Sequence, residues 1–169
     1  MNAPSQPLDS TTLSTPVGSW GIVVLDGVVV ASGFASAADL SQRLAPELRA
    51  AGLRGRRDLG PVTAAARAYL DGDLSALDAV QVSQPGGPFL QEIWRVMRQI
   101  PAGQTWTYAE LAAKAGRPTA VRAAGSGCAR NLVAPFVPCH RVVRSDGTLG
   151  GYYYGLPVKQ WLLAHERAA

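Results

Sequence analysis

The sequence Val137-Pro138-Cys139-His140-Arg141-Val142-Val143 places one of the two cysteines of the chain directly before one of its two histidines. Apolar β-branched residues flank the pair and predict a short buried connection or strand end. A cysteine in such a place has three interpretations. It is an inert core thiol, because free cysteine is among the most buried residue types, or it is a metal ligand, or it is a nucleophile.

The possible metal ligands are Cys128, Cys139, His140 and His165. Their spacing matches no common zinc pattern, and adjacent side chains seldom converge on one ion, so we expect no metal. A nucleophilic Cys139 needs a base, because the thiolate attacks and the thiol does not. His140 is the neighbouring base, and Glu166 is a candidate to orient it, while the competing base His165 is expected to face elsewhere.

Charge is distributed unevenly along the 169 residues. Residues 1–85 contain six Lys/Arg and eight Asp/Glu, a net charge of −2, whereas residues 86–169 contain ten and four, a net charge of +6. A basic half beside an acidic one suggests a polyanionic partner, nucleic acid first. The chain has no apolar run long enough for a membrane helix, so we expect a cytoplasmic globular protein.

The first half predicts a small α/β scaffold domain over residues 16–85, preceded by a flexible polar tail, residues 1–15. Asp26-Gly27 between two apolar runs is a strong hairpin signal. A small antiparallel sheet with helices is therefore expected. The predicted elements are strands 20–25 and 28–34, a helix 37–44 capped by Ser36 and broken at Pro46, a basic loop 54–57, a helix 61–70, a third strand 79–82 and a linker 84–88.

The second half, residues 86–169, predicts a mostly α-helical domain. Phe89 to Ile100 form an apolar helical stripe, and Val158 to Arg167 a closing helix. Thr107 and Glu110 form a capping box for a helix 108–115 that Gly116 ends. With a second helix over 119–130 this pattern is typical of a helix-turn-helix.

The helix 119–130 is unusually bare: it contains Ala120, Ala123, Ala124, Gly125, Ser126 and Gly127. Small side chains allow close approach to a neighbouring helix or to a nucleic-acid groove. Arg122 and Arg130 favour the groove. The scarcity of long base-reading side chains favours a minor-groove or shape reader.

Pro138-Cys139-His140-Arg141-Val142 resembles the active-site signature of the O6-alkylguanine-DNA alkyltransferases. The resemblance covers residues 86–167, whereas the first half resembles the family only through Thr15–Gly18 and the hairpin. The further matching motifs are Pro88-Phe89, Ile100–Gly103, Thr107-Tyr108, Arg122-Ala123, Asn131 and Leu162–Glu166.

The resemblance implies a direct-reversal repair protein that acts on double-stranded DNA containing O6-alkylguanine, with O4-methylthymine as a further candidate substrate. Cys139 would accept the alkyl group once and irreversibly. Glu166 would orient His140, which would draw the thiol proton through a water. Asn131 would brace the active-site turn, and Tyr108 would donate toward guanine N3.

The resemblance also implies how DNA binds. Arg122 would fill the space of a flipped nucleotide, with the helix in the minor groove, and Thr119, Ala123 and Arg130 would complete its DNA-binding set.

The resemblance further implies a base pocket, which the carbonyls of Cys139 and Val142, the N–H of Tyr153 and the ring of Tyr152 would line. Tyr154 would narrow this pocket, which predicts good reaction with methyl and poor reaction with benzyl groups.

No cofactor is expected, and the zinc site of some family members is excluded because no Cys or His precedes Cys128. We expect a monomer with no membrane partner, a cytoplasmic protein of bacterial type that joins the nucleoid when bound to DNA. The alternatives are a non-catalytic protein that binds alkylated DNA and a helix-turn-helix regulator with an inert cysteine.

Overall fold

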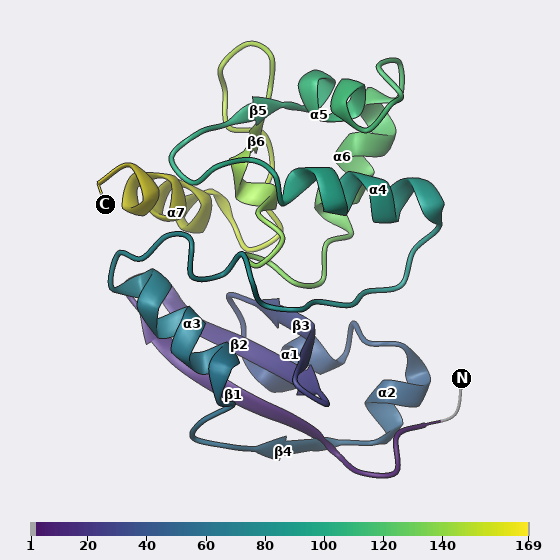
Figure 1. The fold of residues 1–169 in the computed structure, drawn as a ribbon, viewed down its shortest axis with the longest axis vertical. Coiled ribbons are helices and arrows are strands. Elements are labelled where there is room, and N and C mark those ends of the chain that lie inside the picture. Colours follow the sequence, from purple (N-terminus) through teal and green to yellow (C-terminus); the bar gives the residue numbers. More distant parts are fainter. Residues whose placement is uncertain (1–2, 169) are drawn as a thin grey trace.

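The computed structural model describes residues 3–168, and its first half is built on a four-stranded sheet in the order β3-β2-β1-β4 (Figure 1). The strands are β1 Leu8–Thr15, β2 Gly18–Leu25, β3 Val28–Gly33 and β4 Leu53–Gly55. The pairs β1–β2 and β2–β3 are antiparallel, whereas β4 lies parallel to β1. The sheet is therefore mixed, which corrects the purely antiparallel prediction, because a hairpin signal determines the direction of its own two strands only.

Two sequence predictions fail at this edge of the sheet. The expected tail 1–15 is wrong for β1, which pairs with a strand on each side. Leu8 packs in one core cluster and Leu13 in the other, so this polar-looking strand buries an apolar residue on each face. The expected basic loop 54–57 begins inside β4, whose three residues are too few to show an apolar alternation.

The hairpin prediction is confirmed. Leu25 pairs with Val28 across the turn, and both turn residues have positive φ, 50° at Asp26 and 78° at Gly27. Positive φ at both positions is the geometry of the tight type I′ turn, in which glycine is free of strain.

Helices cover both faces of the sheet. On one face, α1 Ala37–Ser41 and α2 Pro46–Ala50 pack over Val23 and Val30. Ser36 caps α1 as predicted, but α1 ends at Ser41, short of residue 44. On the other face, α3 Pro61–Leu70 packs against Ile22, within its predicted bounds. The predicted strand 79–82 is wrong: only Val82 forms a bridge, to Val29, and the segment is a loop.

The second half is mostly helical, with one short two-stranded pairing. Its elements are α4 Pro88–Met97, β5 Trp106–Thr107, α5 Tyr108–Lys114, α6 Val121–Ala129, η1 Cys139–Arg141, β6 Val142–Val143 and α7 Leu156–Ala168. The capping box of α5 is confirmed, with Thr107 Oγ1 accepting from Glu110 N and Glu110 accepting from Thr107 N. The second helix starts two residues later than predicted, because the N–H of Ala120 closes a turn on Arg117.

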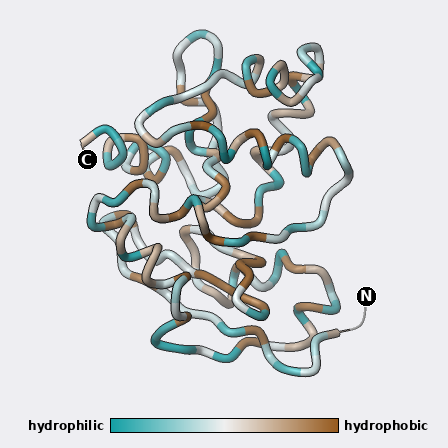
Figure 2. The backbone as a smooth tube through the Cα atoms, in the orientation of Figure 1, coloured by the Kyte–Doolittle hydropathy of each residue, from teal (hydrophilic) through white to brown (hydrophobic). Residues whose placement is uncertain are grey.

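One apolar core joins the two halves. Trp20 of β2, Tyr69 of α3, Ile93 of α4 and Leu162 of α7 belong to a single buried cluster. In Figure 2 the apolar segments gather where the sheet meets the helices. Within residues 3–168, no helix has the length and apolar character needed to cross a bilayer. The core therefore fixes α3 and the sheet against the helix α7 that carries Glu166.

Candidate active site

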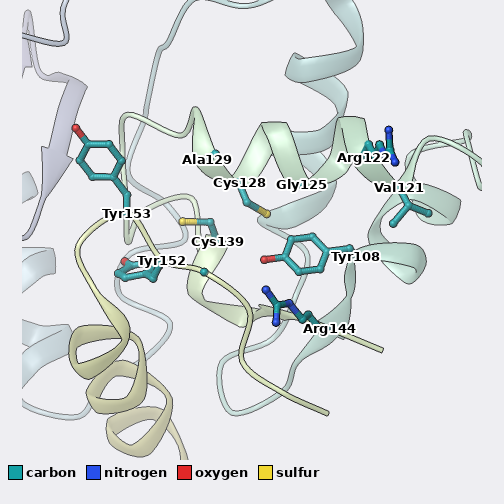
Figure 3. Close-up of a pocket in the computed structure, with 11 residues that line it drawn as sticks. Tyr108, Val121, Arg122, Gly125, Cys128, Ala129, Cys139, Arg144, Tyr152 and Tyr153 are labelled. Atoms are coloured by element: carbon teal, nitrogen blue, oxygen red, sulfur yellow. The ribbon is translucent and has the colours of Figure 1, made fainter. Parts of the chain in front are cut away.

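Cys139 opens the short helix η1 and lines a cavity of about 510 Å³. Its side chain is nearly buried, with 8% of the residue exposed. The cavity has mostly apolar walls from α5, α6 and the segment 151–153, and Tyr108, Cys128 and Cys139 all face it (Figure 3). The cysteine therefore lies in an accessible pocket rather than deep in the apolar core.

A buried relay lies behind the cysteine. His140 is fully buried, and its Nε2 lies 2.7 Å from Glu166 Oε1 on α7. Glu166 also accepts from Tyr69 Oη at 2.9 Å and from Arg141, whose Nε lies 3.0 Å from Oε2 and Nη2 2.8 Å from Oε1. A carboxylate accepts only, so Nε2 of His140 is the protonated nitrogen and Nδ1 keeps its lone pair.

Burial and charge set the protonation states of this relay. Burial lowers the pKa of His140 and outweighs the opposing effect of Glu166. Burial by itself would raise the pKa of Glu166, but the donors His140 and Arg141 hold that pKa well below its ordinary value. At neutral pH the pair is therefore a neutral imidazole and a carboxylate.

The thiol itself needs help to ionise. Burial raises the pKa of Cys139, although a hydrogen bond from Asn131 and the charge of Lys159 act against this rise. A protonated thiol beside a neutral imidazole is the arrangement in which a base must remove the proton during reaction. The site is thus suited to a nucleophilic thiol that loses its proton to a base only during the reaction.

Asn131 ties the segment before Cys139 together. Its Nδ2 donates to Val137 O at 2.8 Å, and its Oδ1 accepts from Val133 N and from Gln84 Nε2, each at 3.1 Å. Asn131 is buried, so these contacts are shielded from water. Asn131 therefore holds together the backbone that leads into Cys139, and its role as a brace of the active-site turn stays a prediction.

The cavity is also lined by Tyr108, Arg122, Tyr152 and Tyr153, all predicted site residues. Burial raises the pKa of Tyr108, which keeps its hydroxyl a proton donor at neutral pH. Arg122 is exposed on α6, and Tyr153 is 62% exposed. Thr119, Ala123 and Arg130 do not line the cavity; Thr119 and Arg130 are exposed near the two ends of α6, and Ala123 is half-buried.

The bare helix α6 uses its glycines for two different purposes. A Cβ on Gly127 would lie 2.6 Å from Ile93 Cγ2, so this glycine permits close packing against α4. A Cβ on Gly125 would meet nothing nearer than Tyr108 Cδ1 at 4.0 Å, and Gly125 lines the cavity. Gly127 therefore fits the explanation of close approach to a neighbouring helix. Gly125 lies on the open side of α6, where approach to a nucleic-acid groove stays a prediction.

The structure corrects the predicted place of two pocket residues. Tyr154 does not line the cavity: its ring packs over Gly33 and Phe34, and its hydroxyl accepts from Arg43 at 3.3 Å. The turn of residues 152–155 directs it to the sheet. Val142 is also outside the lining and fully buried, because β6 pairs with β5 and its carbonyl accepts from Lys159 Nζ at 2.8 Å.

His165 faces away from the thiol, as expected. It stacks on Trp161 at 4.8 Å between ring centroids, and its Nε2 lies 2.8 Å from the carbonyl oxygen of Tyr69.

Sequence reasoning missed four residues of the site. Two of them, Arg141 and Tyr69, are buried and donate to Glu166. Lys159 is buried and donates to the carbonyl oxygen of Val142 in β6, and Arg144 lines the cavity. Lys159 donates to the carbonyls of Val142, Leu149 and Gly151. The position of Arg141 directly after His140 could have indicated that it belongs to the site. No sequence pattern could have indicated Tyr69, since it lies 97 residues from Glu166.

The second half of the chain matches a known family model. Residues 88–168 match the model described as "6-O-methylguanine DNA methyltransferase, DNA binding domain". A methylated-DNA–protein-cysteine methyltransferase of Salmonella typhimurium is 45% identical over 98 residues, 58% of this chain and 57% of that protein. A relative of the same name from Methanosarcina barkeri is 42% identical over 99 residues, 59% of this chain and 62% of that protein. The match thus spans little more than half the length of these relatives.

Solved structures resemble the whole chain. The O6-methylguanine methyltransferase of Mycobacterium tuberculosis superposes with a TM-score of 0.77 at 28% identity, covering 95% of this chain and 93% of that one. A second Mycobacterium tuberculosis structure, of OGT in complex with DNA, has the same TM-score and coverage at 26% identity. The likeness therefore includes the sheet domain, which lies outside the residues that the family model matches.

Proposed function

We propose that the chain is a member of the O6-methylguanine-DNA methyltransferase family and that it repairs O6-alkylguanine in DNA by moving the alkyl group to Cys139. The observation that supports this most strongly is the geometry around the cysteine. A thiol lies in a cavity beside a buried neutral imidazole that a carboxylate orients, and α6, which carries the exposed Arg122, lines the same cavity.

In the proposed reaction His140 Nδ1 takes the thiol proton through a water. Sγ of Cys139 then attacks the alkyl carbon, a carbon–sulfur bond forms, and the carbon–O6 bond breaks. The electron pair of that bond stays on guanine, which regains a proton from a donor such as Tyr108. The product is a thioether, and no group in the site can reverse its formation, so each protein molecule reacts once.

DNA binding is proposed to place α6 in the minor groove. The alkyl carbon is out of reach inside a stacked duplex, so the nucleotide must be flipped out. Arg122, which is exposed and lines the cavity, is suited to fill the space that it leaves, while Gly125 lets the helix approach closely. Thr119, Ala123 and Arg130 would contact the flanking DNA.

Substrate range follows from the cavity rather than from Tyr154. Tyr152 and Tyr153 form the wall beside Cys139, and Tyr154 packs edge-on against both, at 5.8 and 5.0 Å between ring centroids. We propose that Tyr154 affects the pocket only by supporting this wall.

Mass spectrometry after mixing with an O6-methylguanine duplex tests the proposal. We expect one methyl group per protein, on the peptide that contains Cys139. Cys139→Ala should abolish transfer and retain DNA binding, whereas Cys128→Ala should still transfer. A protein that binds the duplex and gains no methyl group is a non-catalytic binder, and transfer to Cys128 contradicts the mechanism.

The role of Arg122 is tested by comparing substrates. Arg122→Ala should slow repair of duplex DNA much more than reaction with the free base O6-methylguanine. Arg95→Ala is the matched control, because Arg95 is exposed and pairs with Glu92 away from the cavity. Equal losses for both variants would indicate general loss of charge attraction rather than a specific role.

A further inference from the structure

Helix α3 contributes a side chain to the relay. Tyr69 is fully buried, and its hydroxyl donates to Glu166 Oε1 at 2.9 Å, the same oxygen that accepts from His140 at 2.7 Å. Tyr69 lies in the scaffold half, which has no other predicted role in the chemistry. Arg141 Nη2 donates to this oxygen as well, at 2.8 Å. Because three residues share one oxygen, the negative charge that His140 meets depends on the other two donors.

Tyr69 is held firmly in this position. Trp20 of β2 packs edge-on against its ring at 6.2 Å, and His165 of α7 does so from another side at 5.2 Å. The carbonyl oxygen of Tyr69 also lies 2.8 Å from His165 Nε2. The hydroxyl therefore has a fixed direction, which a filler of the core does not need.

We propose that Tyr69 is a positioning residue of the relay that limits the negative charge that Glu166 presents to His140. The inference rests on the proposed function. A donated hydrogen bond draws charge from the carboxylate, and a less negative carboxylate stabilises the imidazolium less. With Tyr69 in place His140 stays neutral, so Nδ1 remains able to accept the thiol proton.

Other groups around the pair act in known directions. Arg141 of η1 binds the same carboxylate, and Lys159 of α7 contributes a second buried positive charge that disfavours the imidazolium. Cys139 precedes His140 in η1, and Tyr152 of the cavity wall faces the same region, with burial holding its pKa well above the ordinary value. Tyr69 differs from these groups because it is an uncharged donor contributed by the other half of the chain.

Tyr69→Phe removes the hydroxyl and keeps the ring in the core. We expect the acid limb of the pH profile of methyl transfer to move to higher pH by roughly half a unit to one unit. The rate at alkaline pH should change little. A merely structural role would lower the rate by the same factor at every pH.

Thr63→Val is the matched control, because Thr63 is a fully buried hydroxyl on the same helix that bonds to Asp58 and Gly60, away from Glu166. It should lower the melting temperature without moving the pH profile.

Ring ¹⁵N spectra of the two histidines give a readout that is independent of methyl transfer. The ionisation of His140 should move to higher pH in Tyr69→Phe and stay in place in Thr63→Val. Unmoved ionisation and an unmoved acid limb in Tyr69→Phe overturn the proposal. Absence of methyl transfer in the wild-type protein overturns the proposed function, while the spectra still decide the role of Tyr69.

Discussion

Replacing Arg141 by methionine removes the charge that holds Glu166 ionised inside the protein. Arg141 is 4% exposed, donates to both oxygens of Glu166, and gives Nη1 to the carbonyl oxygen of Ile100 at 2.7 Å. Methionine fills much of the same volume, so the variant leaves a buried carboxylate without its cation and a carbonyl without its donor. Breaking a buried pair in this way costs about 3–5 kcal/mol of unfolding free energy.

The loss should depend on pH in a specific direction. The folded pKa of Glu166 is lowered, so the stability that it contributes is present above the unfolded carboxyl value of about 4.3 and is lost as pH falls through the folded value. Without Arg141 the folded pKa rises and the buried carboxyl takes up a proton more readily. The difference between wild type and variant should therefore be largest near neutral pH and shrink as the solution is acidified.

Thermal and urea unfolding across this pH range measure the effect. A loss of this size lowers the melting temperature by roughly 6–20 °C in a domain of this length. The double variant with Glu166→Gln should recover part of the loss, since a neutral amide is cheaper to bury than an unpaired charge. A loss below about 1 kcal/mol, or one that is the same at all pH values, would refute the argument that the pair is buried and ionised.

Further variants test individual contacts. Gly127→Ala should destabilise the protein by about 1–3 kcal/mol, because its Cβ would press on Ile93, whereas Gly125→Ala should be near neutral or mildly stabilising in urea unfolding. Equal effects would contradict the packing of α6 on α4. Lys159→Met should cost about 2 kcal/mol or more and speed hydrogen exchange in residues 142–151, because three backbone carbonyls lose their donor. Unchanged exchange there would rule out that Lys159 holds this segment in place. Thr107→Ala should lower unfolding free energy by about 1 kcal/mol through loss of the capping box, and a larger loss would indicate a role beyond the cap.

Local signals predicted local structure well. The Asp26-Gly27 turn, the capping box of Thr107 and the proline start of α3 were all confirmed, because each depends on residues within a few positions. The predictions were wrong where a strand pairs with a partner that is distant in the sequence. β1 has a Ser/Thr-rich sequence and becomes a strand because β2 and β4 flank it, and β4 is three residues long.

The sequence by itself was enough to predict the proposed reacting pair, because Cys139 and His140 are neighbours and their motif fits a nucleophile and a base. Tertiary structure alone decided what surrounds them. Glu166 reaches His140 from α7, and Tyr69 reaches Glu166 from α3, since the shared core fixes both helices against η1. The tertiary structure also directs the side chain of Tyr154 toward the sheet and away from the cavity. Side chains that are distant in sequence meet only when the chain packs. Residues 137–143 by themselves therefore do not indicate which distant side chains will contact them.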